Sequence, residues 1–204
     1  MNTLNLFSKV IFHDNLKLSE KDKQKLKQVV KKEKYNQVED KNSSCISESL
    51  HLLDDNKLNK IKQTIVDAFM KFNKETLKYN NEFEMTTCWS TKSSKNNYSN
   101  FHNHTNNFYS GVYYIDVDEN TGEIEFCDFS NNTFELSPTE YNIYNSKSWK
   151  LKPNNDMIIF FPSDLHHMIH LNKSNKDRYS LAFNFFPTGK IGIGDSTLEV
   201  NSIN

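Results

Sequence analysis

The hydrophobic periodicity of the chain changes near residue 80, and this change constrains the fold more than any other feature. Before Asn80, apolar residues recur every three or four positions, as they do on one face of a helix. After Asn80, apolar residues alternate with polar ones or form short runs between turns, which is typical of strands. The sequence therefore predicts N-terminal helices followed by a β-rich second half.

Two helices are expected in the first half. Ser19 is a good N-cap with Asp22 three residues later, and the first helix should extend to about Lys34. A second helix is expected from about Asp55 to Tyr79, with one apolar face that must be buried, most simply against a sheet. Residues 4–12 are predicted as an opening strand and residues 35–53 as polar and irregular. The apolar positions of the second helix are Leu58, Ile61, Ile65, Ala68, Phe69, Phe72 and Leu77.

Many short strands separated by turns indicate a sandwich, barrel or jelly roll in the second half. A turn at 118–122 should join two of these strands as a hairpin, and polar connections are expected at 91–107 and 130–148. With 204 residues and neither repeats nor a linker, we expect a single domain over 1–204, with a helical support region about 1–80 and a β core about 81–190. The strands are predicted at 83–90, 108–117, 123–129, 157–163 and 178–186.

Composition narrows the classes of partner and compartment. A formal net charge of −1 does not favour a nucleic-acid or membrane-surface partner. No run approaches the roughly 20 apolar residues that span a bilayer, and the N-terminus lacks the pattern of a signal peptide. Cys45, Cys88 and Cys127 are widely spaced, which fits reduced thiols. We therefore expect a cytoplasmic protein.

Five of the seven histidines fall into two groups at the ends of predicted strands. His102 and His104 precede the strand at 108–117, and the group containing His166, His167 and His170 follows the strand at 157–163. On an extended chain, residues i and i+2 point to the same side, so the first pair can chelate one ion. An imidazole from the second group would complete one face of the metal and leave the other open. Imidazole suits Fe, Zn, Cu and Ni alike, and a surface position for both groups is the structural alternative.

The strand 178–186 carries two different faces. Tyr179, Leu181, Phe183 and Phe185 form an apolar face that should pack against the helices. Arg178, Ser180, Ala182 and Asn184 form a small polar face, which is unusual inside a barrel unless something polar binds there. A guanidinium offers a bidentate fork and a hydroxyl adds one donor, so Arg178 and Ser180 together can hold a carboxylate. The alternative is an exposed Arg178 at the start of an edge strand.

Three segments of the sequence, taken together, resemble those of a known protein family. HNHTNNFYSGVYY (102–114), DMIIFFPSDLHHMI (156–169) and RYSLAFN (178–184) resemble the 2-oxoglutarate/Fe(II) oxygenases common in phages and marine bacteria, which are distantly similar to prolyl hydroxylases. The resemblance covers nearly the whole chain. It implies a double-stranded β-helix of the jelly-roll, cupin-like class, mainly β, with the N-terminal helices packed on one sheet. If the gene is phage-encoded, the implied compartment is the host cytoplasm.

The resemblance also assigns roles to residues. It implies His102, His104 and His167 as metal ligands, with Arg178 and Ser180 binding the distal carboxylate of 2-oxoglutarate. Tyr114 is the better match to a tyrosine that contacts the same carboxylate, and Asn184 is expected to contact the cosubstrate or substrate. The wider superfamily has Asp or Glu where this chain has His104. Asp116 or Asp128 could take that place, although neither has the right local spacing.

The implied activity is a dioxygenase that uses Fe(II) and 2-oxoglutarate, hydroxylates a substrate and releases succinate and CO2. Two alternatives stay open: another cupin-type metalloenzyme, such as a three-histidine dioxygenase or an isomerase, and a non-catalytic jelly-roll binding module. The substrate is expected to be a small molecule or a protein side chain, selected by the loops 91–100 and 130–152. Phe101, Phe108, Tyr98 or Trp89 could line its entrance or belong to the core, and the core is the favoured place for Trp89. The sequence does not fix the oligomeric state.

Overall fold

The computed structural model describes residues 2, 4–129 and 136–202, which form two antiparallel sheets and a small helical layer. The large sheet has the order β1 (Phe12–Asn15), β9 (Met157–Pro162), β6 (Tyr109–Asp116), β11 (Arg178–Ile191), β4 (Glu82–Ser93), β3 (Cys45–Ser47) and β2 (Tyr35–Gln37), and β12 (Leu198–Val200) pairs with β11. The small sheet has the order β5 (Ser99–His102), β10 (His166–Ile169), β7 (Ile124–Cys127) and β8 (Ser148–Leu151). A mainly β protein built from antiparallel sheets is what the sequence predicts.

Both expected helices form. Helix α1 (Glu20–Lys32) begins after Ser19, whose hydroxyl accepts a hydrogen bond of 3.2 Å from the backbone N–H of Asp22, as expected for an N-cap. Helix α2 (Asn59–Phe72) follows 3₁₀ turns at Leu52–Asp54 and Asn56–Leu58 and continues into a π-turn at Asn73–Leu77. No helix in the described part of the chain is both long and apolar enough to span a bilayer.

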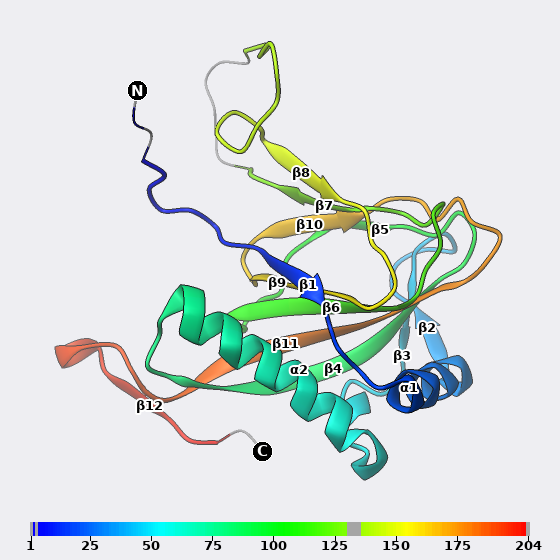
Figure 1. Cartoon of the computed structure of the whole chain (residues 1–204), viewed down its shortest axis with the longest axis horizontal. Helices are drawn as coiled ribbons and strands as arrows, with labels where there is room; N and C mark the ends of the chain where they lie inside the picture. Colours follow the sequence, from blue (N-terminus) through cyan, green and yellow to red (C-terminus); the bar gives the residue numbers. More distant parts are fainter. Residues whose placement is uncertain (1, 3, 130–135, 203–204) are drawn as a thin grey trace.

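The elements form three layers, with the helices on one face of the large sheet and the small sheet on the other (Figure 1). Between the helices and the large sheet, Phe69 of α2 stacks on Phe185 of β11 with ring centroids 4.2 Å apart. A second core fills the space between the sheets and includes Tyr114 and Phe161. The alternation of β11 therefore directs Leu181 and its apolar neighbours to the helices and the polar face to the small sheet.

Strand β7 does not form the hairpin that the sequence predicts with the strand before it. Strand β6 is already flanked by β9 and β11, so it has no free edge, and β7 instead pairs with β10 and β8 of the small sheet. The turn at 118–122 is thus a crossover between sheets. The hydrophobic periodicity of a strand indicates which of its faces is buried, but it does not indicate which strand is its pairing partner.

Three further segments differ from the prediction. The opening strand is only Phe12–Asn15, at the edge of the sheet against β9, while Leu4, Leu6 and Phe7 are exposed. The segment 35–53 contains β2 and β3, and the segment 91–107 contains β5 and the end of β4. These strands are short and polar, so they lack the apolar alternation that would reveal them. The expected connection at 130–148 lies partly outside the described residues; its described part precedes β8.

Replacing Phe69 with alanine should destabilise the fold strongly. The side chain is 0% exposed and contacts rings from four strands of the large sheet, so the cavity left behind should lower the free energy of unfolding by about 3–5 kcal/mol. Chemical denaturation measures the change. Phe7→Ala is the matched control, because Phe7 is 99% exposed and should change stability by about 0.5 kcal/mol or less. Similar losses for the two variants would contradict the packing described here.

Candidate metal and anion site

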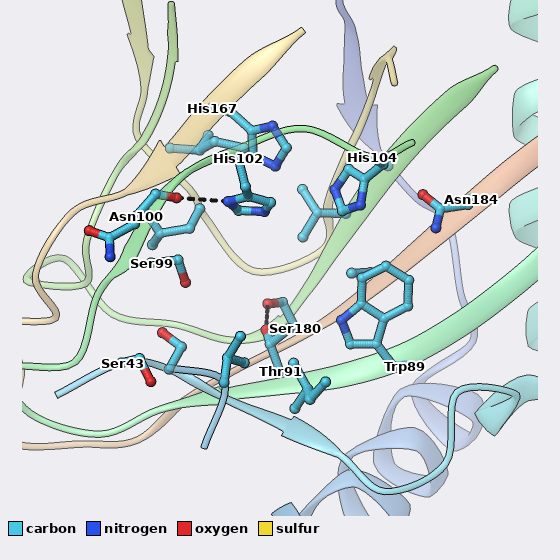
Figure 2. Close-up of a pocket in the computed structure, with 18 of the residues that line it drawn as sticks. Ser43, Trp89, Thr91, Ser99, Asn100, His102, His104, His167, Ser180 and Asn184 are labelled. Carbon is cyan, nitrogen blue, oxygen red and sulfur yellow. Dashed lines mark hydrogen bonds between the residues drawn. The ribbon is translucent and has the colours of Figure 1, made fainter. Parts of the chain in front are cut away.

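A cavity of about 500 Å³ lies between the two sheets and collects the polar residues singled out in the sequence. Its wall includes the polar face of β11, which contributes Arg178, Ser180, Ala182 and Asn184, and the histidines of the small sheet stand opposite (Figure 2). Cavities of this size hold small-molecule ligands in many proteins. The polar face of β11 therefore faces a space that can hold a ligand.

Three histidines from two distant segments converge at this cavity. His102 and His167 are directly opposite each other on β5 and β10, and their ring centroids are 4.3 Å apart. His104 follows β5, and its backbone N–H donates to Ser163 O at 2.9 Å, which holds the segment in place. One ring nitrogen from each histidine lies within 4.8 Å of the others (Figure 2). Within the described residues, no other group of three histidine, cysteine or carboxylate side chains is close enough to share a metal ion.

Backbone carbonyls fix the tautomers of two of these rings. His102 Nδ1 lies 2.7 Å from Asn100 O, and His167 Nδ1 lies 3.1 Å from Leu165 O. A carbonyl oxygen only accepts, so Nδ1 carries the proton in both rings and Nε2 keeps its lone pair. Metal-binding histidines are commonly oriented in this way by the ring nitrogen that does not bind the metal. Asn100 and Leu165 therefore prepare Nε2 for a metal, a role that the sequence analysis did not assign.

The environment also keeps the imidazoles of His104 and His167 neutral. Burial, followed by the influence of the nearby His102, lowers the pKa of His104 to about 4. Burial, followed by the charges of His102 and His104, brings the pKa of His167 well below its ordinary value. Neutral imidazole is the form that binds metals, so these rings compete little with protons near neutral pH.

Arg178 is the only arginine in the sequence, and it is only 4% exposed. Its Nη1 donates to Gly122 O at 3.3 Å, whereas Nε has no hydrogen-bond partner and the guanidinium has no carboxylate partner among the described residues. The phenol oxygen of Tyr114 is also buried without a partner there, and its ring lies 5.8 Å from the guanidinium carbon. A buried cation without a counterion is costly, so these donors fit an anionic ligand. The alternative of an exposed Arg178 is therefore excluded.

Burial also shifts the pKa values of Arg178 and Tyr114. Burial lowers the pKa of the Arg178 guanidinium, and the nearby Tyr114 opposes this. Burial raises the pKa of Tyr114 to about 12, against the influence of Arg178. The phenol is therefore neutral and offers an O–H donor, while the arginine, with its high intrinsic pKa, remains the cation.

Ser180 and Asn184 line the same cavity but already have protein partners. Ser180 Oγ lies 2.6 Å from Thr91 Oγ1, so if Thr91 donates, the Ser180 hydroxyl proton is free for a ligand. Asn184 accepts from Ser110 Oγ at 2.7 Å and donates through Nδ2 to Thr87 Oγ1 at 2.9 Å. These bonds fix the side chains in place. Their partners on β4 and β6 are uncharged strand residues, which no pattern in the sequence marks as functional.

Several expectations about the surroundings of the site are wrong. Trp89 is not a core residue: it lines the cavity, with its ring centroid 5.8 Å from that of His104. Phe101, Phe108 and Tyr98 lie outside the cavity lining. Asp116 does not replace His104, because it pairs with Lys27 and Lys31 of α1 at 2.8 and 3.0 Å. Asp128 does not belong to the candidate metal group either. His166 turns outward, where its ring contacts Phe129.

The chain is similar to known oxygenases in sequence and in fold. Residues 87–184 match a protein family described as "Putative 2OG-Fe(II) oxygenase". No curated protein sequence matches significantly. Among solved structures, a Pseudomonas putida prolyl-4-hydroxylase aligns with a TM-score of 0.59 and 11% identity over 89% of this chain and 95% of its own. A Trichoplax adhaerens prolyl hydroxylase, in complex with a peptide fragment of hypoxia inducible factor, aligns with a TM-score of 0.61 and 15% identity over 86% of this chain and 83% of its own.

A third similar structure contains bound ligands. HygX from Streptomyces hygroscopicus, with nickel, 2-oxoglutarate and hygromycin B bound, aligns with a TM-score of 0.64 and 8% identity over 88% of this chain and 84% of its own. Identities this low establish a shared fold only. The family match over residues 87–184 contains all seven residues of the predicted site, and the solved structures share the fold.

Proposed function

We propose that the chain is a dioxygenase that uses Fe(II) and 2-oxoglutarate and hydroxylates a substrate bound at the open side of the cavity. The observation that carries the proposal is the buried Arg178, which has no counterion among the described residues and lines the same cavity as three convergent imidazoles. A dianion that chelates a metal at one end and carries a carboxylate at the other fits both features. The family match favours the same cofactors.

In this proposal His102, His104 and His167 hold the iron through their ring nitrogens. With 2-oxoglutarate and O2, the bound iron supplies the oxidation of a C–H bond, coupled to the conversion of 2-oxoglutarate to succinate and CO2. Three neutral imidazoles remove none of the charge of Fe(II), whereas the two-histidine, one-carboxylate set removes one unit. The anionic cosubstrate therefore takes a larger share of charge compensation here, which makes its own anchoring more important.

The protein's contribution at the other end of the cavity is an anchor for the distal carboxylate. Arg178 supplies the charge and a planar fork, and Tyr114 and Ser180 add hydroxyl donors. Asn184 sits near His104, on the side of Trp89 (Figure 2), where it can orient the cosubstrate or the substrate. Apolar side chains such as Val112 and Phe161 exclude water from the space between, which strengthens the charge interactions.

The three-imidazole set itself favours a second candidate, a three-histidine dioxygenase that needs no cosubstrate. Such an enzyme would have no use for a buried arginine facing the metal cavity, so Arg178 favours the 2-oxoglutarate reaction. Succinate formation that depends on 2-oxoglutarate separates the two.

Anaerobic titration with Fe(II) should give a visible metal-to-ligand charge-transfer band only when 2-oxoglutarate is also present. His167→Ala should abolish the band and succinate formation, because one of three ligands is lost. His166→Ala is the matched control: the neighbouring histidine contacts Phe129 outside the cavity, so the band should be unchanged. Equal bands in wild type and His167→Ala would exclude the proposed metal site.

Arg178→Met should weaken 2-oxoglutarate binding by about 10- to 100-fold, the equivalent of the roughly 1.5–3 kcal/mol of a charge-assisted hydrogen bond. Oxalate chelates metals in a similar way but lacks the distal carboxylate, so its affinity for the same iron-loaded variant should stay within about threefold of wild type. Competition against the charge-transfer band measures both affinities. If oxalate and 2-oxoglutarate weaken equally, Arg178 supports the metal site and not the carboxylate.

A further inference from the structure

The cavity has a third wall, formed by the segment around β2 and β3, that the proposed cofactors do not use. Val38, Glu39, Ile46 and Leu50 contribute to it, and Val38 and Leu50 are exposed at its rim. Exposed apolar side chains at the mouth of a cavity offer a surface to the apolar part of a ligand. Trp89 extends the same apolar surface towards His104.

Glu39 is held in position on this wall. Its backbone N–H donates to Ser43 Oγ at 3.0 Å, and the backbone N–H of Ser44 donates to Tyr98 O at 2.7 Å, which ties the segment to the start of β5. The Glu39 carboxylate accepts a hydrogen bond from the side-chain amide of Asn100. The carboxylate therefore has a defined place at the mouth, and it still has acceptor capacity for a ligand.

The charge of Glu39 is not neutralised by a neighbour. Among the described residues it forms no salt bridge, and of those that line the cavity it is the only acidic one. Arg178 lines the same cavity, but it is buried, whereas Glu39 is exposed. The mouth of the cavity is thus anionic, and the anion-binding group is buried inside it.

The position of Glu39 relative to the metal group follows from the strand that connects them. Asn100 and His102 both lie on β5 and both line the cavity, at a point where a β-bulge interrupts the pairing of β5 with β10. Figure 2 shows both at the cavity, linked by the hydrogen bond from the His102 ring to Asn100 O. A group bound by Glu39 is therefore held close to the histidine group, with room for an apolar body against Trp89 and Leu50.

We propose that Glu39 determines substrate specificity and that the substrate class is an organic ammonium, in which a positively charged amino group is joined to an apolar body. The ammonium binds the Glu39 carboxylate and the apolar body lies along Val38, Leu50 and Trp89, which brings a C–H bond towards the metal. This inference rests on the proposed function for the reaction, but the binding of the cation requires only the cavity.

The test compares isosteric probes by calorimetry, using the full chain under anaerobic conditions with Fe(II) and 2-oxoglutarate, and again without them. The n-hexylammonium ion should bind wild type at least fivefold more tightly than n-hexanol or n-hexanoate. Glu39→Gln should reduce the affinity for hexylammonium about five- to tenfold and leave hexanol within twofold. Raising the salt concentration should diminish the preference, because it screens the ion pair.

Glu119→Gln is the matched control, since it makes the same change of charge at an exposed glutamate outside this cavity, and it should keep the preference. Melting temperatures verify that all variants are folded. The Nα-acetyl methylamides of lysine and norleucine form a second pair, in which a stronger preference than that of hexylammonium would identify a protein side chain as the source.

The possible outcomes distinguish the proposed cation site from the proposed function. If wild type binds hexanol as well as hexylammonium, or if Glu39→Gln keeps the preference, the inference is wrong. If Glu39→Gln alters the charge-transfer band but not the preference, Glu39 positions Asn100 and His102 instead. A wild-type protein with the band and without the preference overturns this inference alone. A protein without the band that retains a Glu39-dependent preference keeps the cation site and overturns the proposed function.

Discussion

The two-residue alternation of β11 is the constraint on which the rest of the structure depends. This strand is the middle member of the large sheet, between β6 and β4, and both of its faces are covered. One face requires large apolar side chains to pack with α2, and the other must stay small and polar to leave the cavity open. A shift of one residue in its pairing would place Phe183 and Phe185 in the cavity and bury Arg178 against the helices. Fold and site are therefore specified by the same strand.

The electrostatics of the cavity follow a consistent order from inside to outside. A buried guanidinium and three convergent imidazoles line the cavity, and a carboxylate stands at the mouth. In the proposed complex, Fe(II) and Arg178 contribute three positive charges and 2-oxoglutarate contributes two negative ones. Glu39 then brings the sum to zero before a substrate binds. In the proposed complex, His104 as a neutral ligand leaves part of the charge compensation to Glu39 at the mouth of the cavity.

The sequence predicts most of the features that produce a hydrophobic periodicity or contain a distinctive residue type. Helix α2 and the two faces of β11 follow from side-chain spacing, whereas the choice of His167 as the partner of His102 and His104 rests on the family resemblance. The pairing partner of β7 cannot be predicted from spacing, because strand pairing depends on which sheet edges are free once the other strands have paired. Strands β2, β3 and β5 are short and polar and leave no hydrophobic signal. For the same reason no sequence pattern marks Glu39 or Asn100, because their positions depend on long-range pairing of segments that look irregular in the sequence.

The composition of the chain makes Arg178 unusually accessible to spectroscopy. Of the 25 lysine and arginine residues, the other 24 are all lysines. Feeding isotope-labelled arginine during expression would therefore label one guanidinium in the entire protein, and a nitrogen–proton spectrum would contain a single Nε–H resonance. That Nε has no acceptor among the described residues, so its chemical shift would report directly on the arrival of an anion. Occupancy of the inner end of the cavity becomes observable in the unmodified chain, without turnover and without a substitution.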